Sequence, residues 1–572
     1  MRRLLFILSL LAVLSMLTVG VVPAAEPEGS DVVYERNETL YTSGTQWGPP
    51  SSWNPMVTWG YAMGTTGLCY ETLFIYDPFT NEYMPWLAEE GKWSSPTVYD
   101  LKLRQGITWS DGKPFTAADV VFTVELGKKF ATVQYSTIWE WLQSVEQVDD
   151  YNVKFTFSDP LYQEWAHFLF YRAMLPKHLW ESKTEEEVVS GANENPVGTG
   201  AYLYDTHSQD RMVWVKNENW WGKEALGLDM KPKRIVDVVN SSNNVALGLV
   251  LQGGLDLSNN FLPGVATLLQ SGYALETYYP EPPYMLSANT AWLVLNNAKK
   301  PMDDPAFRRA MAYAVDVSQI VQVVYGNIVM AANPTGLLPI WDQFVDKDVV
   351  AELGPSYDPA KAKQILADAG YADTDGDGFV EAADGSKIEL TIIVPFGWTD
   401  WMESIKVIAN GAQAVGINLK PDYPDYGGYT DARNSGKFDM LISNEVQISN
   451  TPWRYYDWMF DAPIRETMGN GNYQRYDNQK VFDLVVQLDK TPVDDIDGMT
   501  KVISEIQRIQ LTDMPLIPLW YNCMWAQYSN AVWTNWPSSA EGRNHYLPTS
   551  WREYWNMTSI LMLADLKLAE SE

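Results

Sequence analysis

The stretch YDLKLRQGITWSDGKPFTAADVVFT, residues 99–123, decides the fold class of this chain. Residues 99–103 place an apolar side chain at every second position, which is the pattern of a half-buried strand. Asp111-Gly112 predicts a tight turn, because glycine tolerates a positive φ and aspartate bonds its own backbone. Thr116 then precedes Asp119 by the spacing of a helix capping box. The stretch therefore predicts a strand, a turn and a helix start, one unit of an α/β protein.

The same residues carry a family resemblance. From Leu103 to Phe122 the chain follows the pattern LR.G..(W/F).DG.P(F/L)TA.DV.F at every fixed position. In this it resembles the family-5 solute-binding proteins of ABC transporters, the peptide, nickel and oligosaccharide group. The resemblance implies that the segment lies in a domain inserted beside two ligand-binding lobes. It implies a family and leaves the ligand open.

Other segments match that family in the same order along the chain. They are residues 40–55, 70–78, 85–93, 195–202, 292–296, 304–316, 416–419, 436–440 and 514–521. The resemblance implies an α/β fold of the two-lobe periplasmic binding protein type (type II, cluster C) with an extra inserted α/β domain. The expected division is 1–25 signal peptide, 26–75 lobe 1, 76–195 inserted domain, 196–290 lobe 1 again, 291–528 lobe 2, and 529–572 lobe 1.

The N-terminus has the pattern of an export signal. Arg2-Arg3 precede the apolar residues 4–22, and cleavage is expected after Ala24, with Ala25 as second choice. An uncleaved anchor is the minor alternative. No cysteine follows the apolar run, so no lipoprotein-type lipidation is expected. A periplasmic protein is therefore expected.

The composition is acidic, with 72 Asp and Glu against 41 Lys and Arg and a formal net charge of −31. A net negative charge of this size repels polyanions, which disfavours nucleic acid and uronate-rich sugars as ligands. The chain has two cysteines, Cys69 and Cys523, and its sequence is compatible with one bridge or with two buried free thiols.

No catalytic motif stands out. The chain has no HExxH, GxSxG, P-loop or CxxC, and its four histidines (His167, His178, His207 and His545) show no metal-ligand spacing. An enzyme is therefore not expected, no cofactor is required, and a nickel or haem ligand is disfavoured. Nothing singles out a glycosidase pair among the acids, and a glycoside hydrolase stays as the weakest alternative.

The chain contains 25 Trp, and several lie in Gly-, Pro- or Asn-rich contexts. Trp and Tyr rings cover the apolar faces of sugars, while amide side chains bond their hydroxyl edges. The resemblance places Trp47, Trp398, Trp401 and Trp520 on loops that relatives bring to one cleft. The full set of expected ligand contacts is Gln46, Trp47, Asn240, Asn260, Trp398, Trp401, Asn444, Trp453, Trp520 and Tyr521.

The choice between sugar and peptide depends on one acidic residue. Peptide-binding relatives pair such a residue with the α-ammonium of the peptide, in the segment that precedes Pro452 here. This chain has residues 447–450 (QISN) there, and Glu445 lies further back. We therefore expect a neutral oligosaccharide, of β-linked gluco- or manno-type. An oligopeptide or dipeptide is the alternative for the same fold.

The expected mechanism is closure of the two lobes on the ligand, followed by delivery to an ABC transporter permease in the membrane. A monomer is expected.

Residues 373–384, DTDGDGFVEAAD, fit the spacing of a calcium loop. Oxygen ligands would come from Asp373, Asp375, Asp377, the Phe379 carbonyl, Glu381 and Asp384. The last ligand is Asp where Glu is usual, and a strand rather than a helix is expected to follow. No Ca²⁺ is required by the expected function, and an ion bound at this loop would have a structural rather than a regulatory role.

Overall fold

The computed structural model describes residues 33–570, apart from 45–46, 58–61, 445 and 550–557. The predicted signal peptide, Gln46 and Glu445 lie outside these residues. Within the part that is described, no helix combines the length and the apolar character that crossing a membrane requires.

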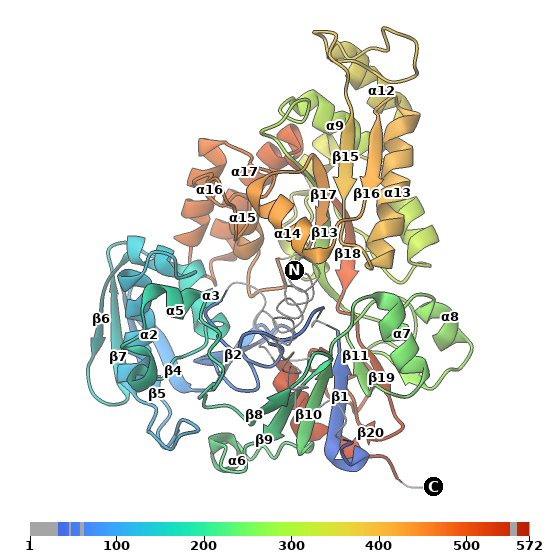
Figure 1. Ribbon diagram of the computed structural model, residues 1–572. Helices are drawn as coiled ribbons and strands as arrows, with labels where there is room; N and C mark the ends of the chain where they lie inside the picture. The colour runs from blue at the N-terminus through green and yellow to red at the C-terminus, as the bar shows by residue number, and fades with distance from the viewer. Residues whose placement is uncertain (1–32, 45–46, 58–61, 445, 550–557, 571–572) are drawn as a thin grey trace, which may run out of the picture.

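Three sheets organise the described chain (Figure 1). The sheet of lobe 1 has the order β12 (Leu275–Glu276), β19 (Gln527–Ser529), β11 (Leu257–Ser258), β1 (Thr39–Ser43), β10 (Arg234–Val238), β9 (Arg211–Lys216) and β8 (Tyr202–His207). The sheet of lobe 2 has the order β14 (Met330–Ala331), β18 (Leu516–Cys523), β13 (Ser287–Leu295), β17 (Met440–Ser443), β15 (Leu390–Ile393) and β16 (Leu419–Asp422). The inserted domain has the order β4 (Ala88–Ser95), β5 (Val98–Leu103), β7 (Asn152–Phe157) and β6 (Leu142–Gln147).

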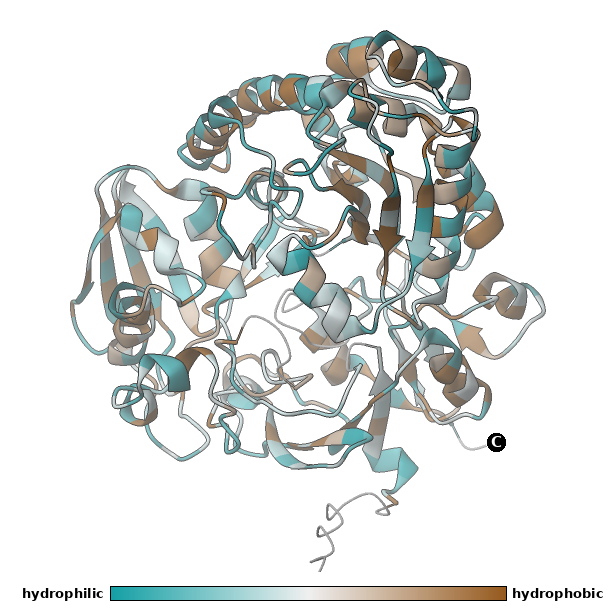
Figure 2. Cartoon of the chain, turned by 45° about the horizontal axis from the view of Figure 1, so that its top comes forward, coloured by the Kyte–Doolittle hydropathy of each residue, from teal (hydrophilic) through white to brown (hydrophobic). Residues whose placement is uncertain are grey.

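Helices pack around these sheets. Those that matter below are α2 (Ala117–Lys129), α3 (Tyr162–Tyr171), α7 (Asn243–Leu251), α13 (Thr399–Ala414), α14 (Tyr426–Ser435), α15 (Trp453–Met459), α16 (Gln479–Asp489) and α17 (Ile496–Asp513). In lobe 2 the central strands β13 and β18 are almost entirely buried, because each is paired on both edges and each of its faces packs into a hydrophobic cluster. Figure 2 shows strands of this sheet largely in brown, the colour of hydrophobic residues, beside helices in which brown and teal residues alternate.

The stretch at residues 99–123 folds as the sequence predicts. Tyr99 and the other alternate apolar residues of β5 are buried, Gly112 takes a φ of +85°, and α2 begins after Thr116. Thr116 N–H donates to Asp119 Oδ2 at 2.9 Å, and Lys177 N–H donates to Asp119 Oδ1 at 2.9 Å. Asp119 thus ties the start of α2 to the segment after α3. The motif therefore builds the inserted domain and has a structural role.

A buried carboxylate joins the inserted domain to lobe 1. Glu71 is 3% exposed and accepts three indole N–H bonds, from Trp86 (2.9 Å), Trp220 (3.1 Å) and Trp221 (2.8 Å). Burial raises the pKa of Glu71 to about 7, and the hydrogen bonds from the three indoles oppose that shift. Three tryptophans of this Trp-rich chain are therefore held at one structural centre.

The glycines of residues 195–202 are required by close backbone contact. A Cβ on Gly198 would lie 1.9 Å from Cys69 O, and one on Gly200 would lie 2.1 Å from Leu68 O. Cys69 and Cys523 are both buried free thiols, in the cores of different lobes. Burial raises the pKa of both thiols.

The chain crosses from lobe 1 to lobe 2 just before β13, and it returns to lobe 1 between β18 and β19. The boundary predicted at 290/291 falls inside β13, which belongs wholly to the lobe 2 sheet, and the boundary at 528/529 falls inside β19 of lobe 1. The connecting segments therefore lie a few residues from the predicted boundaries. The division into domains stays a prediction.

Candidate ligand-binding site

The carboxyl ends of three parallel strands meet at one edge of lobe 1. β1 pairs in parallel with β10 and with β11, so the residues that follow these strands lie together. Asn240 Nδ2 donates to Ser43 Oγ, and Ser43 Oγ donates to Asn260 Oδ1 at 3.5 Å. α/β sheets commonly bind ligands at this edge, beyond the carboxyl ends of their strands.

Asn240 and Asn260 carry unused hydrogen-bonding atoms at this edge. They are 2% and 1% exposed. Among the described residues, the acceptor Asn240 Oδ1 and the donor Asn260 Nδ2 have no hydrogen-bond partner. Since a buried unpaired polar atom costs about 1–3 kcal/mol, the pair suits a group that both donates and accepts. A hydroxyl is such a group.

Lobe 2 presents the equivalent edge. β15 pairs in parallel with β17, and the half-buried Trp398 and Asn444 follow these two strands. Gly397, with a φ of +90°, lies so close to lobe 1 that a Cβ would be 2.9 Å from Ser241 O. The N–H of Asn243 donates to Gly397 O at 3.3 Å. The tip of lobe 2 therefore touches lobe 1.

Aromatic rings from both lobes come together at this junction. The rings of Trp47 in lobe 1 and Trp398 in lobe 2 have centroids 5.4 Å apart. Trp398 also stacks on Tyr426 of α14, at 5.8 Å and 28°, and meets the edge of Trp401 at 4.7 Å. We call Trp47, Trp398, Trp401 and Tyr426 the aromatic cluster. Trp47 and Trp398 are half-buried, whereas Trp401 is 3% exposed and belongs to the core.

A buried carboxyl group fixes the junction from the side of lobe 2. Asp400, in the first turn of α13, is 5% exposed and accepts from Asn243 Nδ2 of lobe 1 at 3.0 Å and from Tyr325 Oη at 3.1 Å. Burial raises the pKa of Asp400 to about 6 from its ordinary value of 3.8. The contact between the lobes thus includes a group that titrates in the acid range.

We expect Asp400→Asn to remove a pH dependence of stability. Between pH 3.8 and about 6 the native Asp400 keeps its proton while the unfolded one loses it, so the free energy of unfolding of the wild type falls as pH rises through this window. The fall is about 3 kcal/mol at most. The asparagine can still accept from Asn243, and its own stability should not change with this ionisation. Urea unfolding from pH 4 to 8 measures the difference, with the exposed Asp431→Asn as control; parallel profiles for wild type and Asp400→Asn would contradict the expectation.

Three of the predicted contacts lie away from the aromatic cluster. Trp520, expected on a loop, is fully buried in β18, where its ring lies 5.1 Å from that of Tyr325. That expectation is wrong, because β18 is a central strand with both faces covered. Tyr521, also in β18, donates its hydroxyl to Leu337 O at 2.8 Å and accepts from the N–H of Asn333 at 2.9 Å. Trp453 begins α15 and faces the inserted domain, 6.5 Å from the ring of His167.

Sequence reasoning missed Asn289 and Tyr426. Asn289, near the start of β13, donates from Nδ2 to Gln447 Oε1 at 2.7 Å, and its Oδ1 is buried without a partner among the described residues. Its only signal was an amide side chain just before the apolar run 291–295. Tyr426 follows an Asp-capped helix start and gave no signal, because its contact with Trp398 exists only in the folded chain.

The acidic loop at residues 373–384 brings three of its expected ligands together. Carboxylate oxygens of Asp373, Asp375 and Asp377 lie within 4.8 Å of one another, a donor set that suits a hard cation. Lys387 Nζ already contacts Asp375 (2.5 Å) and Asp377 (3.0 Å). The other two predicted acidic ligands bond elsewhere: Glu381 accepts from Thr374 N–H at 2.8 Å, and Asp384 accepts from Ser386 N–H at 3.0 Å. The loop fits a calcium ion in part.

Comparison with known proteins identifies what this arrangement resembles. The family model described as bacterial extracellular solute-binding proteins, family 5 Middle, matches residues 82–465. The oligopeptide-binding protein AppA of Bacillus subtilis (strain 168) is 27% identical over 431 residues, which cover 74% of this chain and 75% of AppA. The dipeptide-binding protein of Escherichia coli (strain K12) is 23% identical over 77% of this chain and 81% of that protein.

A much closer structural match comes from Thermotoga maritima. The periplasmic oligopeptide-binding protein of an oligopeptide ABC transporter from that organism, solved with bound mannohexaose, has a TM-score of 0.91 and 46% identity, and the match covers 94% of this chain and 100% of that chain. AppA in complex with a nonapeptide has a TM-score of 0.76 at 21% identity, over 93% of this chain and 99% of that one, and shows the shared fold alone.

Proposed function

Because the chain belongs to the bacterial extracellular solute-binding proteins, family 5, it is the substrate-binding protein of an ABC transporter, and we propose that it binds a neutral oligosaccharide, of β-linked gluco- or manno-type. The predicted two-lobe fold with an inserted domain is confirmed. The observation that carries the proposal is the aromatic cluster, which joins Trp47 of one lobe to Trp398 of the other.

The chemistry of the junction suits sugars. Half-buried indole rings can cover the C–H face of a sugar ring, and the unused amide atoms of Asn240 and Asn260 can bond its hydroxyls. Asn444 supplies a further amide at the edge of lobe 2. These groups are neutral, so they match a ligand with many hydroxyls and no charge. The mannohexaose in the Thermotoga maritima protein supports the same ligand class.

The mechanism that we propose is closure of the lobes. Ligand contacts from both edges favour the form in which the edges face each other, and this differential affinity shifts the population toward it. The closed protein then delivers the ligand to its permease, and no bond of the ligand is broken.

A peptide ligand is the second candidate, and the named relatives favour it. AppA and the dipeptide-binding protein are peptide-binding by name. However, residues 446–453 of this chain contain no acidic side chain, and Ser449 and Asn450 hydrogen-bond to each other there at 3.1 Å. A peptide would therefore lack a carboxylate partner for its ammonium in this segment.

Tryptophan fluorescence titration of the purified protein tests the proposal, with neutral oligosaccharides, oligopeptides and dipeptides as ligands. We expect saturable quenching or shift with a sugar, and recovery of the sugar intact. A response to peptides alone would replace the sugar by the second candidate and leave the transporter assignment in place. Cleavage of the sugar during the assay would favour the hydrolase alternative.

We also propose that Asp373, Asp375 and Asp377 hold a structural Ca²⁺. Millimolar calcium is expected to raise the thermal unfolding midpoint above that in EDTA, because a ligand at 100 times its dissociation constant adds about 2.7 kcal/mol. Lys387→Gln should strengthen the effect, since the ammonium competes for Asp375 and Asp377. Magnesium is the matched control. Equal midpoints in calcium and EDTA for both proteins would rule the ion out.

A further inference from the structure

The inserted domain shares its core with lobe 1 and meets lobe 2 across an interface. Hydrophobic residues of β5 in the inserted domain and of β9 in lobe 1 belong to one buried cluster. Among the described residues, no sheet pairs a strand of the inserted domain with a strand of lobe 2. Lobe 2 is joined to lobe 1 through residues 277–286 and 524–526. A hinge motion at these two segments therefore moves lobe 2 relative to lobe 1 and the inserted domain together.

The start of α3 in the inserted domain is capped by lobe 2. The residue before this helix, Leu161, is apolar and makes no side-chain cap bond. Asp489, the last residue of α16, supplies the missing acceptor: its Oδ1 accepts from the N–H of Gln163 at 3.1 Å and from the N–H of Glu164 at 2.9 Å. These are the second and third residues of α3, the positions that an N-cap side chain ordinarily serves. The cap of α3 thus comes from the other side of the interface.

Gln163 strengthens this contact with its own side chain. Its Nε2 donates to Thr491 O at 2.7 Å, and its Oε1 accepts from Thr451 Oγ1 at 2.6 Å. Gln163 is 1% exposed and Asp489 is 8% exposed, so the bonds between them are closed to water. Because separated partners need water instead, this contact depends on the position of lobe 2.

Lys490 adds an ion pair to the same corner of lobe 2. Its Nζ lies 2.5 Å from Asp159 Oδ2 and 4.3 Å from the ring centroid of Trp141, both in the inserted domain. Lys490 is half-buried, and it directly follows Asp489 in the chain. Three consecutive residues of lobe 2 therefore hold the inserted domain. We call the whole contact the latch; its members are Trp141, Asp159, Gln163 and Glu164 of the inserted domain, and Thr451, Asp489, Lys490 and Thr491 of lobe 2.

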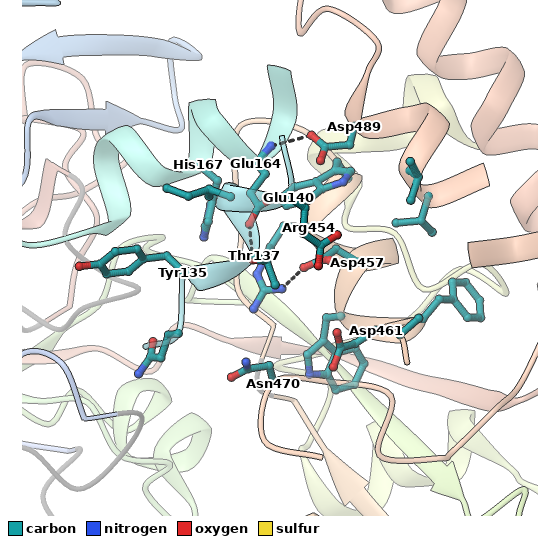
Figure 3. Close-up of a pocket in the computed structure, with 18 of the residues that line it drawn as sticks. Tyr135, Thr137, Glu140, Glu164, His167, Arg454, Asp457, Asp461, Asn470 and Asp489 are labelled. Atoms are coloured by element: carbon teal, nitrogen blue, oxygen red, sulfur yellow. Dashed lines mark hydrogen bonds and ion pairs between the residues drawn. The ribbon is translucent and has the colours of Figure 1, made fainter. Parts of the chain in front are cut away.

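Charged side chains and open space lie next to the latch. Figure 3 shows Glu164 of the inserted domain and Arg454 and Asp457 of lobe 2 around a cavity of about 270 Å³, together with the bond from Glu164 to Asp489. Phe170 of α3 packs with an apolar cluster that is formed mostly by lobe 2 residues. Domains move relative to each other unless their interface is large and hydrophobic. The polar part of this interface therefore favours a contact that opens and closes.

From the cap that lobe 2 provides to α3 we infer that Asp489 is a positioning residue for ligand binding: the latch stabilises the closed form and raises the affinity for a ligand that it does not touch. In the open form the first N–H groups of α3 and the Asp489 carboxyl group are hydrated, and in the closed form they bond each other. The inserted domain thus supplies one half of a closing device. The latch rests on the lobe closure of the proposed function, but it does not depend on the class of ligand.

Pulsed electron–electron double resonance on the full chain tests the latch, with spin labels at Gln147→Cys of the inserted domain and Glu505→Cys of lobe 2. Both positions are exposed and lie outside the latch. The native Cys69 and Cys523 are buried, and burial raises the pKa of both thiols, so the labels react at the introduced cysteines. The distance distribution then gives the ratio of closed to open protein.

We expect two distances in the ligand-free wild type, and a closed-to-open ratio about 10-fold lower in Asp489→Ala. That factor corresponds to 1.4 kcal/mol, the contribution of one or two hydrogen bonds. Lys490→Met, at a half-buried position that folding tolerates better, should lower the ratio by about 3- to 5-fold, because it removes the ion pair and the ring contact. Asp483→Ala, at an exposed carboxylate of the same helix, is the matched control and should leave the ratio unchanged.

A single distance common to wild type, Asp489→Ala and Lys490→Met would overturn the inference, and so would the same ratio in all three. An equal loss in Asp483→Ala would overturn it as well, because the effect would then not come from the cap. With mannohexaose as the probe, Asp489→Ala should need up to about 10-fold more sugar than the wild type to close; equal affinities would contradict the latch. If mannohexaose moves neither protein while the ligand-free ratio still depends on Asp489, this sugar is rejected as the ligand and the latch stands.

Discussion

Trp398→Ala is expected to weaken, by about 10- to 100-fold, the binding of the oligosaccharide that changes the tryptophan fluorescence. A buried aromatic anchor contributes about 2 kcal/mol or more to binding, and each tenfold change in affinity corresponds to 1.4 kcal/mol. Trp398 meets Trp47 of lobe 1 at 5.4 Å and stacks on Tyr426 of its own lobe at 5.8 Å. Its removal takes away the ring that we propose covers a sugar face, together with a contact that exists only when the lobes meet.

Matched variants make this test specific. Trp398→Phe keeps an aromatic face and should retain most of the affinity, while Trp47→Ala should lose a comparable amount to Trp398→Ala. Trp139→Ala, at a half-buried tryptophan of the inserted domain whose indole donates to Val124 O at 2.9 Å, should bind like the wild type. Calorimetric titration gives the dissociation constants. Wild-type affinity in both Trp398→Ala and Trp47→Ala would remove the aromatic cluster from the ligand site.

Glu71→Gln is expected to lower the free energy of unfolding by about 3 kcal/mol, because hydrogen bonds to a charged group contribute about 1.5–3 kcal/mol and unpaired buried donors cost more. Three indole N–H groups point at the two carboxylate oxygens, and an amide replaces one oxygen by an NH₂ donor. At least one indole then faces a donor instead of an acceptor.

The effect of Glu71→Gln should be measured above pH 7, where the carboxyl group is ionised even with its raised pKa. Calorimetric unfolding should show a lower midpoint than the wild type. The half-buried Glu89→Gln, which loses only an ion pair with Lys102, should stay within about 0.5 kcal/mol of the wild type. Equal unfolding midpoints for Glu71→Gln and Glu89→Gln would show that the stabilisation by the three indole hydrogen bonds does not require a negatively charged acceptor.

Much of the fold follows from local pattern. The alternation at residues 99–103, the turn at Gly112 and the cap at Asp119 are each specified within a few residues, and the structure contains all three. Such features depend on backbone geometry and on side-chain period, which the sequence displays directly.

The placement of the aromatic residues divides into two cases. Trp47 and Trp398 follow strands in loops, and strand ends of parallel sheets gather at one edge, so their approach could be foreseen. Trp520 could have been assigned to the core, because residues 516–521 (LIPLWY) are a continuous rather than an alternating apolar run, and the structure buries the whole strand. Trp453 gave no such signal, and only its docking against the inserted domain brings its ring to within 6.5 Å of that of His167.

The sequence by itself determined the family, the α/β lobes and the tryptophans available for a ligand, because these depend on motifs, periods and composition. Tertiary structure alone decided which polar atoms at the junction have no partner among the described residues, such as Asn240 Oδ1 and Asn260 Nδ2, and which carboxyls are buried, such as Glu71 and Asp400. The physical reason is that pairing and desolvation depend on neighbours far apart in the chain. Asn243 meets Asp400, and Glu71 meets Trp221, only after the sheets have packed.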